Sequence, residues 1–254
     1  MSWSASGEVF VGDKARRRAT LDPRNTFSSF KRLMGSEKDD KSSSSPTLWC
    51  PNLDRIVTPA EASAELLKEL LRTAQTFSGL DIDRAVITVP TRFSHAAVDA
   101  TRQAAQLAGL ERTVILQEPV AAALAHAFVD VTRVEEQLLL VFDLGGGTCD
   151  VSVLEAFDGI IEVVATNGDP KLGGDDMDAA LGRWLLNSQQ SLGGEKLLDE
   201  DPLQRVRLRE AAEMAKIQLS HASRTRVRVP FMKGTAGIDT EVTVATFQAE
   251  IAEL

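Results

Sequence analysis

A glycine turn is the segment of this sequence whose residue types and spacing point most directly to chemistry. The run VFDLGGGTCDVSVLE at 141–155 places Gly145, Gly146 and Gly147 immediately before Thr148. Glycines let the backbone take positive φ and approach a ligand closely, because no Cβ intervenes. Successive N–H groups in such a turn form a concavity suited to phosphate. The run therefore predicts a phosphate-binding hairpin, and glycines that serve only the turn are the competing interpretation.

Carboxylates on both sides of the turn favour the phosphate site. Asp143 enters the turn and Asp150 leaves it, so both would lie where a Mg²⁺ ion that retains several waters is expected beside phosphates. The Thr148 hydroxyl can bond a phosphate oxygen. The sequence contains no GxxxxGK[ST] and no GxGxxG that opens a helix, so P-loop and dinucleotide-binding folds lose support.

The elements that must position this turn can be traced along the chain. Apolar runs at 138–143 and 149–155 predict two strands joined by the turn, and 160–165 predicts a third. A capping box at 58–61 predicts a helix to about residue 77. The remaining expected elements are strands at 85–89, 113–116, 226–229 and 241–244, and helices from about 94 to 108, 119 to 128, 175 to 189 and 202 to 220. Strands and helices interleave, so the fold class is α/β.

Composition excludes several other classes. The chain has 28 Lys+Arg against 37 Asp+Glu, a formal net charge of −9, which disfavours sequence-independent binding to nucleic acid. There is no run of eighteen apolar residues, so no membrane association is expected. Residues 36–57 carry charges, four consecutive serines and two prolines, and this composition predicts a mobile connector.

The 141–155 run resembles the second phosphate-binding segment of the heat-shock protein 70 family, the DnaK-like ATP-driven chaperones. Five further runs resemble family segments in family order: NTFSSFKRLMG at 25–35, AVITVPTRF at 85–93, LQEPVAAALAHAF at 116–128, GDPKLGGDDMD at 168–178 and EAAEMAKIQLS at 210–220. The resemblance implies an actin-like or sugar-kinase-like two-lobed ATPase fold. Residues 1–130 would form the remainder of lobe I, and residues 131–254 a partial lobe II with hairpin 141–155 and an adenosine-facing helix 202–220.

The resemblance also implies roles for individual residues. Lys31 matches the family lysine that stabilises the transferred γ-phosphate and positions the attacking water. Glu118, Asp143 and Asp150 match the carboxylates that hold Mg²⁺, mainly through its water shell. Thr148 matches the threonine that contacts phosphate. Alone, Lys31 would be interpreted as a solvated helix lysine and Glu118 as a carboxylate at the end of a strand.

A second group of residues is implied to hold the nucleoside. Glu213, Lys216 and Ser220 share one helix face by their spacing and match positions that clasp adenosine. Without the resemblance, a surface Glu–Lys pair is the alternative. Gly173 and Gly174 precede a helix whose N-terminal N–H groups could face the nucleotide cleft, or they form a plain turn.

Some departures from the family pattern limit these expectations. We expect the family's first phosphate hairpin to be absent, because only residues 1–7 precede the EVFVG run. The later glycine-rich adenine segment and the substrate-binding domain are likewise expected to be missing. Arg92 stands where the family usually has tyrosine, Val98 where it has a relay arginine, and Cys149 where it has phenylalanine.

The resulting hypothesis is a partial ATP-binding domain of a DnaK-type chaperone, with ATP and Mg²⁺ as cofactors and hydrolysis coupled to protein folding. Expected partners are a J-domain protein and a nucleotide exchange factor, whereas client peptides would not bind directly. The alternatives are a catalytically inactive interaction fragment, an incomplete gene product, or an actin-like or sugar-kinase relative. The resemblance favours the bacterial cytoplasm, a plastid or a mitochondrion.

Overall fold

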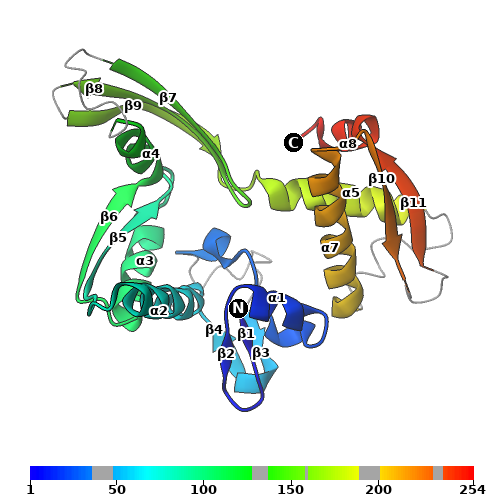
Figure 1. Cartoon of the computed structure of the whole chain (residues 1–254), viewed down its shortest axis with the longest axis horizontal. Helices are drawn as coiled ribbons and strands as arrows, with labels where there is room; N and C mark the ends of the chain where they lie inside the picture. The colour runs from blue at the N-terminus through cyan, green and yellow to red at the C-terminus, as the bar shows by residue number, and fades with distance from the viewer. Residues whose placement is uncertain (36–47, 128–136, 158–159, 189–200, 231–236) are drawn as a thin grey trace.

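The computed structural model describes residues 1–35, 48–127, 137–157, 160–188, 201–230 and 237–254. Figure 1 shows four packed groups that follow one another along the chain. The first is the blue group at the N-terminus and the last is the orange and red group at the C-terminus. No helix in these described ranges is long and apolar enough to cross a membrane.

The N-terminal group is built from short hairpins. Strands β1 (Ser2–Trp3) and β2 (Val9–Phe10) pair antiparallel, and β3 (Leu48–Cys50) pairs with β4 (Arg55–Val57). Helix α1 (Asp13–Ala19) and the 3₁₀ turns η1 (Pro23–Asn25), η2 (Phe30–Leu33) and η3 (Pro51–Leu53) complete it. Trp3, Cys50 and Val57 share a buried cluster.

The prediction of a connector over all of 36–57 is wrong for its second half. Leu48, Cys50 and Val57 point inward and are buried, so 48–57 contributes a hairpin to the core. Burial of these apolar side chains stabilises the hairpin, although most of the segment is polar. The first half, 36–47, lies outside the described residues.

The second group is a helix-covered parallel strand pair. It contains α2 (Pro59–Ser78), β5 (Arg84–Val89), α3 (His95–Leu107), β6 (Arg112–Gln117) and α4 (Glu118–Ala127). The capping box is confirmed, because Thr58 Oγ1 accepts from the Glu61 N–H and Glu61 Oε2 accepts from the Thr58 N–H. The parallel pair β5–β6 brings the chain to Glu118 directly at a strand end.

The third group carries the glycine turn. Strands β7 (Gln137–Leu144), β8 (Cys149–Phe157) and β9 (Ile160–Asp169) form an antiparallel meander, as predicted. Helix α4 lies against this sheet, and the β7–β8 end reaches toward α5 (Figure 1).

The fourth group is a separate helix–sheet unit. It contains α5 (Gly174–Asn187), α7 (Pro202–Leu219), β10 (Arg224–Val229), β11 (Ile238–Thr243) and α8 (Val244–Ile251). Leu181, Leu185 and Leu208 pack with Val227 and Val242 in its core. This core fixes α5, whose first turn meets the glycine turn, and α7, which bears Glu213 and Lys216.

Candidate functional site

Four of the predicted catalytic and metal-binding residues lie at one end of the β7–β8 hairpin. Asp143 and Asp150 are directly opposite each other in the antiparallel register. Lys31 Nζ, from η2, donates to Glu118 Oε1 at the start of α4 over 2.7 Å. The fold therefore joins residues that are separated by 87 positions in the sequence.

The charges of these residues act on Asp150. Asp150 is only 5% exposed, and burial raises the pKa of its carboxyl, with Glu118 and Asp143 raising it further. Lys31 and Arg92 act in the opposite direction. Three carboxylates thus concentrate negative charge beside one lysine, an arrangement that favours a cation.

The donor set is compatible with a hydrated magnesium ion. Within the described ranges, no three or more His, Cys, Asp or Glu side chains are grouped closely enough to hold a metal ion by themselves. Mg²⁺ needs no such cage, because it keeps several waters and commonly uses one or two carboxylates with substrate phosphates. Glu118, Asp143 and Asp150 supply oxygen ligands of the right type for that mode.

Only Gly147 among the glycines of the turn serves close approach, and the expectation of positive φ is wrong for all three. Gly145, Gly146 and Gly147 are absent from the positive-φ residues. The Gly145 N–H donates to Thr148 O at 2.9 Å and closes the turn. A Cβ on Gly147 would lie 3.2 Å from Arg32 Nε, so glycine there makes room for the arginine side chain.

The N-terminus of α5 packs directly on this turn. The Gly174 N–H donates to Gly145 O over 3.0 Å, and the Asp175 N–H donates to Gly146 O over 2.8 Å. A Cβ on Gly173 would lie 2.5 Å from Gly146 O, so only glycine allows the contact. The N–H groups of Gly174 and Asp175 therefore orient the turn, and they are not directed at the nucleotide cleft.

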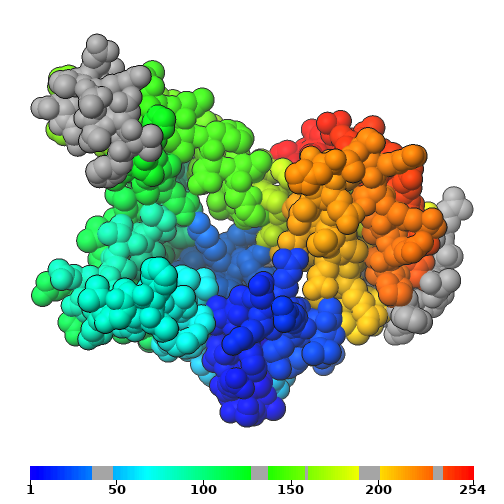
Figure 2. All heavy atoms as spheres, viewed as in Figure 1, coloured from blue at the N-terminus to red at the C-terminus, as the bar shows by residue number. Residues whose placement is uncertain are grey.

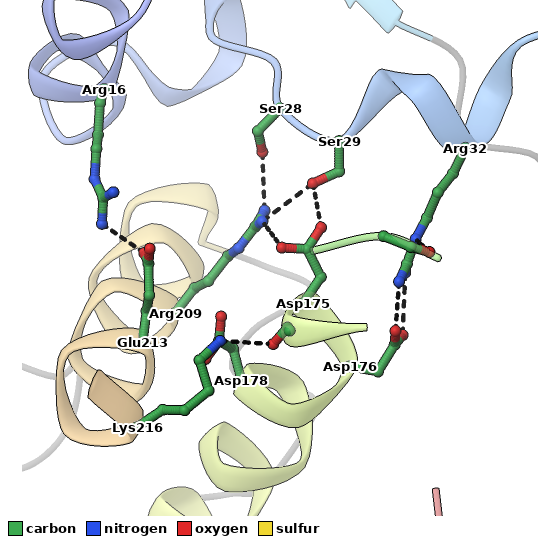
Figure 3. A network of polar contacts seen from close by, with 12 residues as sticks. Arg16, Ser28, Ser29, Arg32, Asp175, Asp176, Asp178, Arg209, Glu213 and Lys216 are labelled. Carbon is green, nitrogen blue, oxygen red and sulfur yellow. Dashed lines mark hydrogen bonds and ion pairs between the residues drawn. The ribbon is translucent and has the colours of Figure 1, made fainter. Parts of the chain in front are cut away.

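The predicted adenosine-facing residues have protein partners. Glu213 accepts from Arg16 Nη2, and Lys216 Nζ donates to Gly174 O and lies 2.7 Å from Asp178 Oδ1. Figure 3 shows Arg16 reaching Glu213, and Lys216 beside Asp178. Asp178 is buried, and burial raises the pKa of its carboxyl while Lys216 lowers it. The alternative of a surface Glu213–Lys216 pair is thus wrong, since each has a separate partner.

The third residue of that helix face differs from the other two. Ser220 is exposed at the C-cap of α7. Glu213 instead lines a cavity of about 380 Å³ between the N-terminal group and α7. Lys31 and the glycine turn do not line this cavity.

Two arginines that the sequence analysis did not assign to the site contact its backbone. Arg32 Nε donates to Gly147 O over 2.7 Å, and its guanidinium pairs with Asp176. Arg92 Nη1 donates to Gly168 O over 2.8 Å. The partners lie 76 to 144 positions away in the sequence, so no local pattern could reveal them. The available signals were the adjacency of Arg32 to Lys31 and the presence of Arg92 where the family usually has tyrosine.

These features define a class. An interleaved α/β chain brings a glycine turn, a lysine and three carboxylates together between its first and second halves. This is the arrangement of a two-lobed, phosphate-binding nucleotide domain, and the predicted fold class is confirmed.

Comparison with known proteins identifies the family. The family model described as Hsp70 protein matches residues 1–254, so the chain belongs to the heat-shock protein 70 family. The chaperone protein dnaK of Trieres chinensis is 40% identical over 100% of this chain and 44% of its own length. The chaperone protein DnaK 1 of Synechococcus sp. is 41% identical over 99% of this chain and 35% of its own length. The chloroplastic heat shock 70 kDa protein 6 of Arabidopsis thaliana is 40% identical over 100% of this chain and 37% of its own length.

The comparisons also set the scope of the match. The chain spans less than half the length of these three curated relatives. It corresponds to part of the nucleotide-binding region of an Hsp70 chaperone, as the sequence resemblance implied.

Proposed function

We propose that this chain binds Mg·ATP at the glycine turn and contributes to ATP hydrolysis in a DnaK-type chaperone. The observation that carries the proposal is the convergence of Lys31, Glu118, Asp143 and Asp150 at the end of the β7–β8 hairpin. Family membership supports it. Phosphoryl transfer depends mainly on positioning and on charge stabilisation, and both would be supplied by these four side chains.

Each side chain has a distinct role in the proposal. Lys31 would exchange its bond to Glu118 for the terminal phosphate, since an ammonium stabilises charge that develops there. Asp143, Asp150 and the released Glu118 would hold the waters of Mg²⁺, which neutralises phosphate charge when bound. Thr148 would donate its hydroxyl to a phosphate oxygen. Glu213, Lys216 and Ser220 would contact adenosine.

The proposed partners and compartment follow from the family. A J-domain protein and a nucleotide exchange factor are the partner classes, and client peptides would be bound by another part of a whole chaperone. The relatives include a cyanobacterial DnaK and a chloroplastic heat-shock protein. We therefore place this chain in a bacterial cytoplasm or a plastid.

One observation favours a second candidate, an interaction module without turnover. Lys31, Glu213 and Lys216 all form ion pairs within the protein. A nucleotide would have to compete with these pairs. A chain in which they persist would bind partners without hydrolysing ATP.

Calorimetric titration with Mg·ATP separates the two candidates. We expect the chain to bind with a Kd below about 1 mM, equivalent to about −4 kcal/mol. Asp143→Ala should abolish the binding heat, because it removes a carboxylate that faces the metal and phosphates. Asp99→Ala, an exposed aspartate in α3, is the matched control and should bind normally.

A folding check makes the titration decisive. Circular dichroism should show that the wild-type protein, Asp143→Ala and Asp99→Ala have the same secondary structure. No binding heat from folded wild-type protein would rule out the ATP proposal, and binding without ADP production would favour the interaction module.

A further inference from the structure

All three backbone carbonyls of the glycine turn are held by hydrogen bonds from other elements. Gly145 O and Gly146 O accept from the first two N–H groups of α5. Gly147 O accepts from Arg32 Nε at 2.7 Å. Two independent segments, α5 and η2, therefore fix the orientation of three successive peptides.

This arrangement determines where the N–H groups of the turn point. The described residues include no cis peptide, and in a trans peptide the N–H lies opposite the C=O. The N–H groups of Gly146, Gly147 and Thr148 therefore point away from α5 and Arg32. None of the three has an acceptor within the described part of the chain. Gly146 is exposed and Gly147 and Thr148 are half-buried, so the unpaired donors lie at an accessible turn beside Lys31's segment.

Arg32 makes a contact that few other side chains could make. Its Nε binds Gly147 O, Nη1 lies 3.0 Å from Asp176 Oδ1, and Nη2 binds Asp176 Oδ2. Figure 3 shows the paired bonds to Asp176. A guanidinium presents its donors in a rigid plane, whereas an ammonium is a point charge. Arg32 thus ties three segments together: η2 with Lys31, the glycine turn, and the first turn of α5.

We propose that Arg32 is a positioning residue for phosphate recognition, which holds the Gly147–Thr148 peptide so that the Thr148 N–H faces the phosphate. Through Asp176 it also fixes Lys31's segment against the first turn of α5. The inference rests on the proposed function, because it assigns the unpaired N–H groups to the phosphates of the same nucleotide. Arg32 acts through the backbone and does not itself touch the phosphate.

Arg209 provides a matched control. It is a second arginine, from α7, that contacts the residues just before η2 and the first turn of α5, with Nη1 2.9 Å from Ser28 Oγ and Nη2 2.8 Å from Asp175 Oδ1. Figure 3 shows it beside the Arg32 contact. It makes no bond to the glycine turn. Arg209→Met therefore removes a comparable ion pair and leaves the turn carbonyls alone.

The first measurement tests the peptide orientation without any nucleotide. Labelling glycine carbonyls with ¹³C and threonine amides with ¹⁵N gives one signal per Gly-Thr pair, and the sequence has two, 147–148 and 234–235. Thr235→Ser removes the second signal and so assigns the first. We expect Arg32→Met to shift the 147–148 signal, and Arg209→Met to leave it in place. An unchanged signal in Arg32→Met would overturn the inference.

The second measurement compares ATP with adenosine by calorimetry. Arg32→Met should weaken Mg·ATP binding about ten-fold, the loss of roughly one hydrogen bond's contribution, and should leave adenosine affinity unchanged. Arg32→Lys keeps the charge but not the planar donors, so it should resemble Arg32→Met. Near-normal Mg·ATP binding by Arg32→Lys would show that only the positive charge at this position matters. An equal loss of adenosine affinity in Arg32→Met would show a general disturbance of the site. Either result would overturn the inference.

The two measurements separate the inference from the proposed function. If the wild-type protein binds no ATP but the 147–148 signal shifts in Arg32→Met, the ATP proposal fails and the positioning of the peptide by Arg32 is supported. If the wild-type protein binds ATP and the signal does not shift, the ATP proposal stands and the role of Arg32 is refuted.

Discussion

Asp150 shows how a single buried carboxylate relates function to stability. It lies beneath the glycine turn with Glu118 and Asp143 nearby, and burial and these neighbours raise the pKa of its carboxyl. Gly168 leaves room for this carboxylate, since a Cβ at that position would lie 3.0 Å from Asp150 Oδ1. An ionised carboxylate that is held in such a place destabilises the folded protein. It would be retained because a cation and its waters need it.

This gives a prediction about pH. The folded protein binds a proton on Asp150 at higher pH than the unfolded chain, whose aspartates have a pKa of about 3.9. Its contribution to the free energy of unfolding therefore falls as pH rises from about 4 through the raised pKa of the folded state. Asp150→Asn removes the ionised group and should raise the Tm at pH 7. The gain should shrink as the pH is lowered toward about 4.

Thermal unfolding followed by circular dichroism between pH 4.5 and pH 7 measures this effect. Asp99→Asn, which removes one negative charge at an exposed position, controls for net charge. A lower Tm for Asp150→Asn at pH 7 would contradict the prediction. It would mean that attraction by Lys31 and Arg92 outweighs the desolvation of the carboxylate.

At the scale of elements, the contact between the glycine turn and α5 is the feature that organises the site. Hairpin β7–β8 and helix α5 were both expected from local patterns, and both are present. Their contact was not expected, because it depends on backbone atoms that carry no sequence signature. Gly173 makes the contact possible.

We predict that Gly173→Ala destabilises the protein. The φ of Gly173 is 178°, a conformation open to any residue, so the effect would be steric. A Cβ would lie 2.5 Å from Gly146 O and 2.7 Å from Gly147 N, and backbone atoms cannot move aside cheaply. Overpacking of this kind costs about 1–3 kcal/mol. Urea unfolding measures the change.

Gly146→Ala is the control for that substitution. A Cβ at Gly146 meets no protein atom within 4 Å, and its φ is not positive. Its free energy of unfolding should therefore stay within about 0.5 kcal/mol of the wild-type value, as for other surface substitutions. Equal stability of the two variants would show that α5 does not pack on the turn as described.

At the scale of the whole molecule, four groups surround the site, and each brings one part of it. Figure 2 shows them as distinct masses, with the blue N-terminal group between the cyan and orange ones. Arginine side chains join the first group to the rest: Arg16 to α7, and Arg32 to α5 and the turn. Polar contacts thus tie the first group to the third and fourth, and a bound ligand or partner could rearrange them, whereas Ala62 of α2 shares a buried apolar cluster with Trp3 and Val57 of the first group.

The sheet that carries the turn has an apolar face exposed to solvent. Leu138, Leu140 and Phe142 of β7 are 73%, 70% and 64% exposed, and they alternate along the strand, so they lie on one face. A row of large apolar side chains of this kind is uncommon on a folded surface.

We predict that the isolated chain binds the apolar dye ANS through this face. Replacing Leu138, Leu140 and Phe142 with threonine should lower the ANS fluorescence of the native protein clearly, because threonine keeps strand propensity and removes apolar area. Leu21→Thr, at an 82% exposed position in the first group, is the control and should change little. Unchanged dye binding in the triple variant, with its circular dichroism intact, would contradict the prediction.

The sequence by itself determined the family, the α/β class, the capping box of α2 and the β7–β8 hairpin. The family follows from six runs that resemble family segments in family order. The class, the capping box and the hairpin follow from short patterns, because hydrogen bonding and hydrophobic periodicity within a segment depend on nearby residues. The hairpin at 48–57 was missed because two or three buried side chains do not stand out against a polar composition.

Only the tertiary structure decided which side chains meet. Lys31 pairs with Glu118, Arg32 with Gly147 O and Asp176, and Lys216 with Asp178. It also showed that Gly147 and Gly173 serve close packing. Such contacts join segments far apart in the chain, and their geometry depends on how separately folded elements pack. No local pattern encodes that packing, so the positioning role of Arg32 became visible only in three dimensions.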